Sequence, residues 1–419
     1  MLMTYKEWLS WFRNLNWTVK WFVIIVLIRP IVDNFYYLKE ISPLISPNYI
    51  VGILTPIMAL YGIFTMKMPN YSRLDSYMRI FTLISGLGCL AILISDSLSF
   101  NSIEQTIKIT FTSYMYFFLR RMIVTKNDLH GVLQAFVYSS LVVVISFGYE
   151  LVFQPINVQI SRGLERYQGN YSDVLNYALY MCGSLLIICY AYLSRDTEKD
   201  RTKNIVILVG GTIFAFLILF NIHHTASYVV ILTILILFMV YNFKKNAIIG
   251  LVFISILGGV GYFLGSETVD EKLMPLIETD IEVYEGERSN EMLLHGRVGR
   301  WTRFLEYFFE KNMVVQFLGL PLTFENPYMY IGKGVHNDFV RTLLSVGYIG
   351  FTLYIVILLN IFNRAIRQKA TMQFLALGVL SALFLYSIST TPLLYPPLMY
   401  ILLPITCMLT LPKHVMDNN

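Results

Sequence analysis

The chain has 419 residues, of which 56% are hydrophobic and 14% are charged, and its formal net charge is +5. A soluble fold of this length does not need so much apolar surface, whereas a protein that crosses a membrane many times does. Many of the basic residues lie in short connections between apolar runs, where membrane topology explains them, so the charge does not indicate a nucleic-acid partner. We therefore expect an all-α integral membrane protein.

Apolar runs long enough to cross about 30 Å of hydrocarbon as helices recur along the whole chain. We predict about twelve transmembrane helices, at residues 18–38, 48–66, 77–97, 103–120, 131–153, 174–193, 204–222, 225–243, 246–265, 341–361, 371–389 and 392–411. The sequence shows no internal repeat, and its longest polar segment lies between the ninth and tenth spans. A transporter made of two matched halves would have its main loop midway. The asymmetry therefore favours an enzyme with a site at the membrane surface.

Basic residues occupy alternate connections between the predicted spans. If the N-terminus is cytoplasmic, the inner side carries Lys67, Arg73, Arg79, Arg120, Arg121, Lys126, Arg195, Lys199, Arg201, Lys203, Lys244, Lys245, Arg364, Arg367, Lys369 and Lys413. The short connections assigned to the outer side, at 95–105 and 389–397, carry neither lysine nor arginine. Because lysine and arginine concentrate on the cytoplasmic side, we expect both termini in the cytoplasm. We expect the chain to lie in the cytoplasmic (inner) membrane.

This orientation divides the chain into three parts. Residues 1–265 contain the first nine spans and an arginine-containing outer loop at 154–173. Residues 266–340 form a large extracytoplasmic loop, and residues 341–419 contain the last three spans and a cytoplasmic tail. In the large loop, aromatic and apolar residues follow helical spacing from Trp301 to Phe308, which predicts an amphipathic helix lying at the membrane interface.

Four arginines in the two outer loops are candidates for binding an anion: Arg162, Arg166, Arg297 and Arg300. A guanidinium group stays charged and matches phosphate oxygens with two parallel hydrogen bonds. Arg297 and Arg300 should share the opening turn of the loop helix, where free N–H groups also attract anions. The alternative is that these arginines contact lipid headgroups or nearby glutamates, as Arg303 could with Glu306.

His336 is the candidate general base, because a neutral imidazole accepts a proton near neutral pH. It lies at the end of the large loop, directly before the tenth span. The alternative is an interfacial histidine that caps this helix. Asn337 is a candidate for binding substrate, and both Asn337 and Asp338 are good N-cap residues; we expect Asp338 to cap or orient before it takes part in chemistry.

Arg29 and Asp33 lie four residues apart within the first span. Charges inside a membrane are costly and indicate functional sites, although a mutual ion pair is the simplest explanation here. Arg29 is therefore a further candidate for contacting substrate. The four cysteines all fall inside apolar spans without histidine or carboxylate partners, so we expect neither a disulfide framework nor a metal site.

Four short motifs occur in order in the last third of the chain. They are Gly296-Arg297 followed by Trp301, then Phe317-Leu318-Gly319, then Val335-His336-Asn337-Asp338-Phe339, and then Gly347-Tyr348-Ile349-Gly350. In order and spacing this set resembles the O-antigen ligase and polymerase family of bacterial membrane glycosyltransferases. The motifs cover about 60 residues, and the twelve-helix plan extends the resemblance loosely over the chain.

The resemblance implies transfer of a saccharide from an undecaprenyl-pyrophosphate carrier to an acceptor hydroxyl, with inversion at the anomeric carbon and without a nucleotide sugar, metal or other cofactor. By the same resemblance, Arg297 is similar to the loop arginine that engages the pyrophosphate, and His336 to the general base. The chain departs from the family at the start of the eighth span, where many members have Ser-Arg and this sequence has Ala226-Ser227-Tyr228. His224 and Arg29 are candidates to supply the missing cation.

These observations lead to three functional hypotheses. The first is a polymerase for O-antigen, capsule or exopolysaccharide, in which donor and acceptor are both carrier-linked repeat units. The second is a ligase that transfers finished glycan to lipid A core or another acceptor. The third, from another class, is a flippase for lipid-linked oligosaccharides. For the enzyme we expect as partners a lipid-linked donor, a glycan or lipid-linked acceptor, membrane lipids and a chain-length regulator.

Overall fold

The structure is a computed structural model, and it describes residues 3–42, 45–95, 99–153, 158–161, 164–169, 171, 173–194, 201–243, 274–323 and 334–412. The predicted ninth span, at 246–265, lies outside the described residues, as does Arg162. Within the described part of the chain, eight helices are long and apolar enough to cross a membrane. The chain is therefore an all-α integral membrane protein with several transmembrane helices, as the composition predicts.

Helices occupy the positions of the other eleven predicted spans. They are α2 (Trp17–Asn34), α4 (Pro47–Thr65), α5 (Arg73–Ser95), α6 (Phe100–Met122), α7 (Lys126–Phe153), α8 (Val174–Leu193), α9 (Arg201–Ile222), α10 (Thr225–Phe243), α16 (Asp338–Ile366), α17 (Ala370–Ser389) and α18 (Pro396–Leu409). Three of these are not among the eight: α2 and α6 contain several charged residues, and α18 has only 14 residues. All three contribute to the cavity described below.

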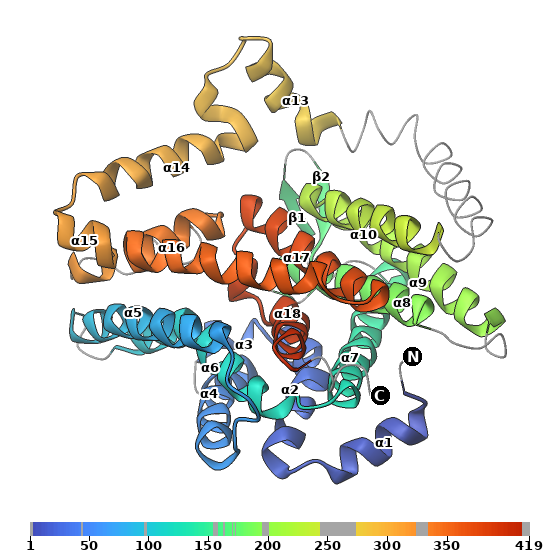
Figure 1. The fold of residues 1–419 in the computed structure, drawn as a ribbon. Helices are drawn as coiled ribbons and strands as arrows, with labels where there is room; N and C mark the ends of the chain where they lie inside the picture. Colours follow the sequence, from blue (N-terminus) through green and yellow to red (C-terminus); the bar gives the residue numbers. More distant parts are fainter. Residues whose placement is uncertain are drawn as a thin grey trace.

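Shorter elements connect and cover these helices (Figure 1). They are α1 (Tyr5–Asn14), α3 (Leu38–Ile41), α13 (Met274–Tyr284), η4 (Asn290–Met292), α14 (Leu293–Phe309), α15 (Met313–Leu318), η5 (Leu320–Thr323) and η7 (Pro392–Leu394), with the strands β1 (Val158–Ser161) and β2 (Leu164–Tyr167). The two strands pair antiparallel, with Gln159 opposite Arg166. This hairpin was not predicted, because four-residue strands are too short to show a clear alternation of polar and apolar residues.

Helix α8 forms the centre of the bundle. It packs against α7, α9, α10, α17 and α18. Of its apolar segment, 89% is buried inside the protein, compared with 22% for α4, so α4 lies at the surface of the bundle and α8 in its interior. Because α8 has protein on every side, its N-terminal end can position polar groups against several neighbouring helices at once.

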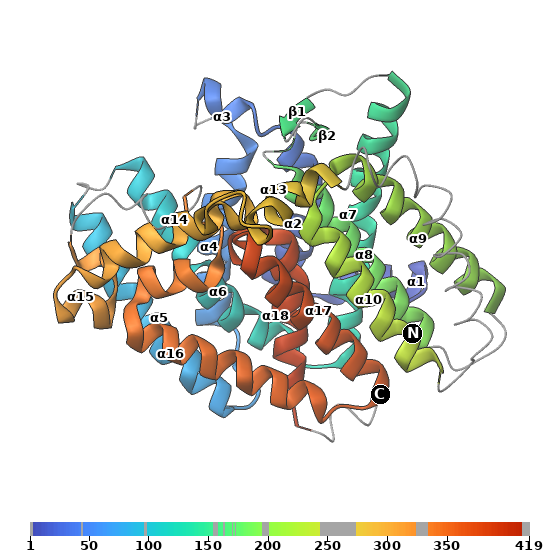
Figure 2. The same cartoon turned by 90° about the horizontal axis from the view of Figure 1, so that it is seen from above.

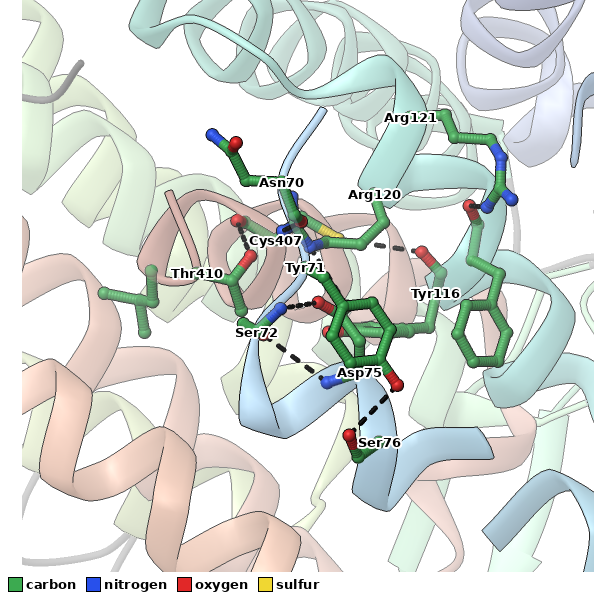
Figure 3. A network of polar contacts seen from close by, with 12 residues as sticks. Asn70, Tyr71, Ser72, Asp75, Ser76, Tyr116, Arg120, Arg121, Cys407 and Thr410 are labelled. Atoms are coloured by element: carbon green, nitrogen blue, oxygen red, sulfur yellow. Dashed lines mark hydrogen bonds and ion pairs between the residues drawn. The ribbon is translucent and has the colours of Figure 1, made fainter. Parts of the chain in front are cut away.

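A polar network joins the helix ends at one side of the bundle (Figure 3). The buried carboxylate of Asp75 at the start of α5 accepts hydrogen bonds from Tyr116 at 2.8 Å and from Arg120 at 3.1 Å, both near the end of α6. Arg121 donates to the carbonyl of Met66 after α4, and Arg364 near the end of α16 donates to the carbonyl of Leu409 in α18. We call this the basic end, because Arg120, Arg121 and Arg364, all assigned to the inner connections, make these contacts.

The opposite helix termini meet at the other side, which we call the hairpin end. Figure 2 shows α3 and the β1–β2 hairpin together there. Several helices have one terminus at this end and the other toward the basic end. They contribute the C-terminal part of α2, the N-terminal parts of α4, α6 and α8, and the first residues of α16 and α18. The bundle thus separates its arginine-rich connections from the predicted outer-loop residues.

Helices α14 and α15 lie against α16 (Figure 1) rather than extending away from the bundle. Phe308 is fully buried in a small apolar cluster with Val335 and Leu344, and Phe304 packs against this cluster. The apolar stripe of the loop helix was expected to face the membrane interface, and for these aromatic residues that prediction is wrong. Their packing against this cluster holds α14 against α16.

A kink in α16 makes this packing close. Gly347 has φ +64° and ψ −170°, outside helical geometry, and a Cβ atom there would lie 2.5 Å from the backbone nitrogen of Leu318. Gly319, which ends α15, has φ +109°, and its Cβ would lie 2.5 Å from the carbonyl oxygen of Ser345. Only glycine fits at either position. The motifs that contain Gly319 and Gly347 therefore lie where α15 and α16 cross in close contact.

Candidate functional site

A cavity of about 400 Å³ lies at the hairpin end, between α2, α4, α6, α8 and the start of α18. Its size is within the range of pockets that bind small molecules, about 300–1,000 Å³. We call it the His336 cavity, because His336 lines it. The charged, amide and tyrosine side chains that share the lining are Arg29, Asp33, Tyr36, Asn48, Tyr49, Glu104, Lys108, Tyr114, Asp173, Asn176, Tyr395 and Tyr400.

The backbone around His336 is held from both sides. On the preceding side, the indole N–H of Trp301 donates to the carbonyl of Val335 at 2.8 Å, and Arg300 donates to the carbonyl of Gly334 at 3.3 Å. The structure thus joins two of the sequence motifs that lie far apart in the chain. His336 itself is partly exposed and has φ +45°, a conformation that residues with a Cβ adopt rarely.

Asn337 fixes the following side. Its side-chain oxygen accepts from the backbone N–H of Val340 at 3.0 Å, which caps α16, and its amide donates to the carbonyl of Ile388 at 3.2 Å. Asn337 is 6% exposed. Because both ends of the amide make structural hydrogen bonds, we assign Asn337 to positioning His336 and do not carry forward its predicted role in binding substrate.

Asp338 orients a second segment of the cavity wall. It is fully buried, pairs with Arg341 at 2.8 Å, and accepts from the backbone N–H of Leu393 at 2.9 Å. Leu393 belongs to η7, and the residues on either side of this turn, including Tyr395, line the cavity. The structure is consistent with the orienting role predicted for Asp338, since its carboxylate links the first turn of α16 to η7, directly before α18.

Three of the predicted arginines lie close together. The pKa of Arg297 is lowered by burial and then by the positive charges of Arg300 and Arg166. The pKa of Arg166 is lowered by burial, against the opposing effect of Asp173. Among the ion pairs formed by described residues, none includes Arg166 or Arg297, and the Nε of Arg166 is buried without a hydrogen-bond partner. This cluster therefore has excess positive charge and suits an anion.

The local backbone explains why Arg297 faces this cluster. α14 begins at Leu293, four residues before Arg297, but Leu294 has φ +50° and Gly296 has φ +75°. These angles interrupt right-handed helical geometry, so regular helix begins after Gly296 and Arg297 lies in its opening turn, where N–H groups are free. By contrast, Arg303 on the same helix is 79% exposed and lies 3.7 Å from Glu291, not beside the predicted partner Glu306.

Asp173 connects the arginine cluster to the His336 cavity. It lies close enough to both Arg166 and Arg297 to interact electrostatically, and it lines the cavity. One of its oxygens accepts from the N–H of Leu175 at the start of α8, and the other accepts from the hydroxyl of Tyr395 at 3.2 Å. Sequence analysis missed Asp173, although its place at the end of an arginine-containing loop, directly before an apolar span, could have suggested it.

Arg29 lies against the cavity, but its charge is balanced. Its Nε lies 2.8 Å from the Asp33 carboxylate one turn later in α2, and both side chains are largely buried. The ion pair that the spacing predicts is present, and the pair also lines the cavity. Arg29 therefore offers less free positive charge than the loop arginines do.

The start of α10 lacks the arginine expected there. The structure places the guanidinium group of Arg166 near it, a residue that was not among the predicted substitutes, His224 and Arg29. His224 is hydrogen-bonded to Ser227 at 2.7 Å and stacks on Tyr386, and it is not among the described residues that line the cavity. Arg166 lies close enough to Tyr228, in the first turn of α10, to interact with it electrostatically. The hairpin therefore brings a guanidinium group close to the first turn of α10.

The described residues contain no group of three or more histidine, cysteine or acidic side chains arranged to bind a metal ion. Comparison with protein-family models and with curated proteins found no match to this chain. The resemblance to the O-antigen ligase and polymerase family therefore rests on the motif residues themselves.

Proposed function

We propose that this chain is a polysaccharide polymerase, which transfers a glycan from an undecaprenyl-pyrophosphate carrier to a sugar hydroxyl of an acceptor. One observation carries the proposal. The imidazole of His336 lines a cavity that also contains charged, amide and tyrosine side chains, and Asp173 in the wall of that cavity adjoins a cluster of arginines with excess positive charge. A base beside an anion site is what transfer from a pyrophosphate to a hydroxyl requires.

The arginine cluster suits the donor. Arg166 and Arg297 would bind the pyrophosphate oxygens, and Arg300 would add charge from the exposed side of α14. Pyrophosphate is already a good leaving group, so the protein mainly neutralises the charge that develops on the leaving oxygen. The mutual repulsion of the arginines in the free protein would be relieved when the anion binds, which favours binding.

His336 would act on the acceptor. As the acceptor hydroxyl attacks the anomeric carbon, the imidazole takes the hydroxyl proton and the bond from that carbon to the pyrophosphate oxygen breaks. The products are a new glycosidic bond and the carrier pyrophosphate. Attack from the side opposite the leaving group inverts the anomeric configuration. Fixing the histidine backbone on both sides keeps the base in place and lowers the entropic cost of reaching the transition state.

The same site would serve a ligase, with lipid A core or another acceptor as second substrate.

We propose that the site faces the periplasm or the cell exterior, because the basic end carries the residues that remain cytoplasmic under the positive-inside rule. A flippase is less well supported, because the unpaired cations lie beside the His336 cavity, whereas the two ion pairs that line it, Arg29 with Asp33 and Lys108 with Glu104, are mutually neutralised.

The test is reconstitution of the full-length protein in proteoliposomes with undecaprenyl-pyrophosphate repeat units from its own gene cluster. Products are separated by size. A ladder of glycans would support a polymerase, and products that form only after a lipid A core or other acceptor is added would indicate a ligase. Transport of the lipid-linked glycan across the bilayer without any new glycosidic bond would contradict the enzyme and support a flippase.

A further inference from the structure

We propose that the wall of the His336 cavity formed by α2, α4 and α6 is the binding subsite for the acceptor saccharide, with Tyr49 and Glu104 recognising its hydroxyl groups. This inference rests on the proposed transfer reaction, and it assigns the second substrate a place in the same cavity.

The distribution of charge separates this wall from the arginine cluster. The cations of the wall are each paired with a carboxylate one helical turn away: Arg29 with Asp33 at 2.8 Å, and Lys108 with Glu104 at 2.5 Å. Arg166 and Arg297 are not in any ion pair among the described residues, and neither lines the cavity. A wall whose charges cancel suits a hydroxylated ligand without net charge, whereas the cluster beyond Asp173 suits the pyrophosphate.

The Glu104 carboxylate has the contacts of a recognition group. One oxygen pairs with Lys108, and the other accepts from the hydroxyl of Tyr49 at 3.0 Å, on the neighbouring helix α4. Glu104 is 25% exposed at its side chain and Lys108 is 40% exposed, so both remain accessible from the cavity. Ion pairs within transmembrane helices are costly and are retained mostly where they serve function. A carboxylate, an ammonium group and a phenol together can accept from and donate to sugar hydroxyls.

The remaining lining adds further groups that can bind a sugar. Tyr36 and Tyr395 offer aromatic faces, and Asn48 offers an amide, in the same cavity as His336. Sugar rings bind to such surfaces by stacking their C–H faces on aromatic rings while their hydroxyls make hydrogen bonds. An acceptor held on this wall would present a hydroxyl to His336, while the donor pyrophosphate is held beyond Asp173.

The experiment measures binding of the free repeat-unit oligosaccharide, which has no pyrophosphate or lipid, to the full-length protein in detergent by saturation-transfer NMR and calorimetry. We expect Tyr49→Phe and Glu104→Gln each to weaken binding about tenfold, the loss of one or two hydrogen bonds. Tyr61→Phe is the matched control, because Tyr61 lies on the same helix, is 47% exposed and contacts Trp17 outside the cavity. Arg297→Lys should also leave this binding unchanged, since the probe lacks the anion.

In the reconstituted reaction, the same two variants should raise the KM for the acceptor and leave the KM for the donor unchanged. Melting temperature and elution volume establish that each variant is folded, and the double variant with Glu104→Gln and Lys108→Gln restores charge balance if Glu104→Gln alone does not fold. The subsite is overturned if the wild-type protein does not bind the oligosaccharide, or if the folded variants bind it as well as the wild type. If binding depends on Tyr49 and Glu104 but no transfer occurs with any acceptor, the proposed function fails while the saccharide subsite stands.

Discussion

His336 combines a reactive side chain with an unusual backbone. Its φ of +45° costs about 1–2 kcal/mol for a residue with a Cβ. The hydrogen bond from Trp301 to Val335 and the two made by Asn337 compensate for this strain. The conformation matters for mutagenesis, because a substitution here changes both the chemistry and the backbone preference. Loss of activity in an alanine variant would therefore have two explanations.

We expect His336→Asn to separate them. Asparagine tolerates positive φ better than most residues, so the variant should keep the fold and the N-terminal turn of α16 while losing the base. Removal of a general base lowers rates by about 10²–10⁴-fold, and the measurement is the rate of glycan transfer in proteoliposomes. His336→Gly, which also accepts this φ, should give a similar loss. Near-normal glycan length in the asparagine variant would refute the assignment of His336 as the base.

Arg297→Lys tests the arginine cluster. Lysine keeps the positive charge but cannot make two parallel hydrogen bonds to a phosphate, so transfer should fall about 10- to 100-fold. Arg303→Lys is the matched control on the same helix, because Arg303 is 79% exposed and lies near Glu291 rather than near the cluster. Equal activities of the two variants in the reconstituted reaction would assign Arg297 to lipid headgroup contact.

The sequence was sufficient to name His336 and Arg297 as candidates, because their residue types and motif spacing predict the proposed chemistry, and that assignment stays a prediction. It was not sufficient for Asp173, Tyr49 and Glu104. These three come from separate parts of the chain, and apolar spans do not specify which of them become neighbours. Their joint presence in one cavity depends on helix packing, which the sequence pattern does not show.

At the scale of elements, most spans could be predicted because each must bury about 20 apolar residues in lipid. Two of the predicted spans are more polar than lipid-facing helices: α6 carries Glu104 and Lys108, and α2 carries Arg29 and Asp33. Their polar faces turn toward the cavity. The kink in α16 was also beyond prediction, since Gly347 fits a straight helix interface as well as a bend.

Gly347→Ala should destabilise the crossing of α15 and α16. The φ of +64° is strained for alanine, and the added Cβ would lie 2.5 Å from the nitrogen of Leu318. Backbone strain and overpacking together should cost about 2–5 kcal/mol. Gly86→Ala on α5 is the matched control, because no atom lies within 4 Å of its added Cβ. Melting temperatures of the detergent-solubilised variants are the measurement, and equal values for the two would contradict the close packing at Gly347.

At the scale of the whole molecule, the structure separates two kinds of positive charge. Arginines at the basic end are held by backbone carbonyls and by Asp75, which makes them part of the fold (Figure 3). Arg166 and Arg297, at the hairpin end, are not in ion pairs among the described residues. The positive-inside rule explains the first group and not the second. This difference allows the orientation to be tested independently of activity.

We expect Glu287→Cys to react with a membrane-impermeant maleimide on intact cells, and Ala370→Cys to react only after the membrane is permeabilised. Glu287 is an exposed residue after α13, and Ala370 is the exposed first residue of α17, directly after the connection from α16 at the basic end. The wild-type protein is the control, because its four cysteines are all buried and should remain unlabelled in both conditions. The reverse pattern would place the His336 cavity on the cytoplasmic side, and a lipid-linked donor would then have to be used before it crosses the membrane. Labelling of both positions in intact cells would instead show that the chain does not insert with one fixed orientation. That result would contradict both the positive-inside assignment of the basic end and the proposed site on the outer face.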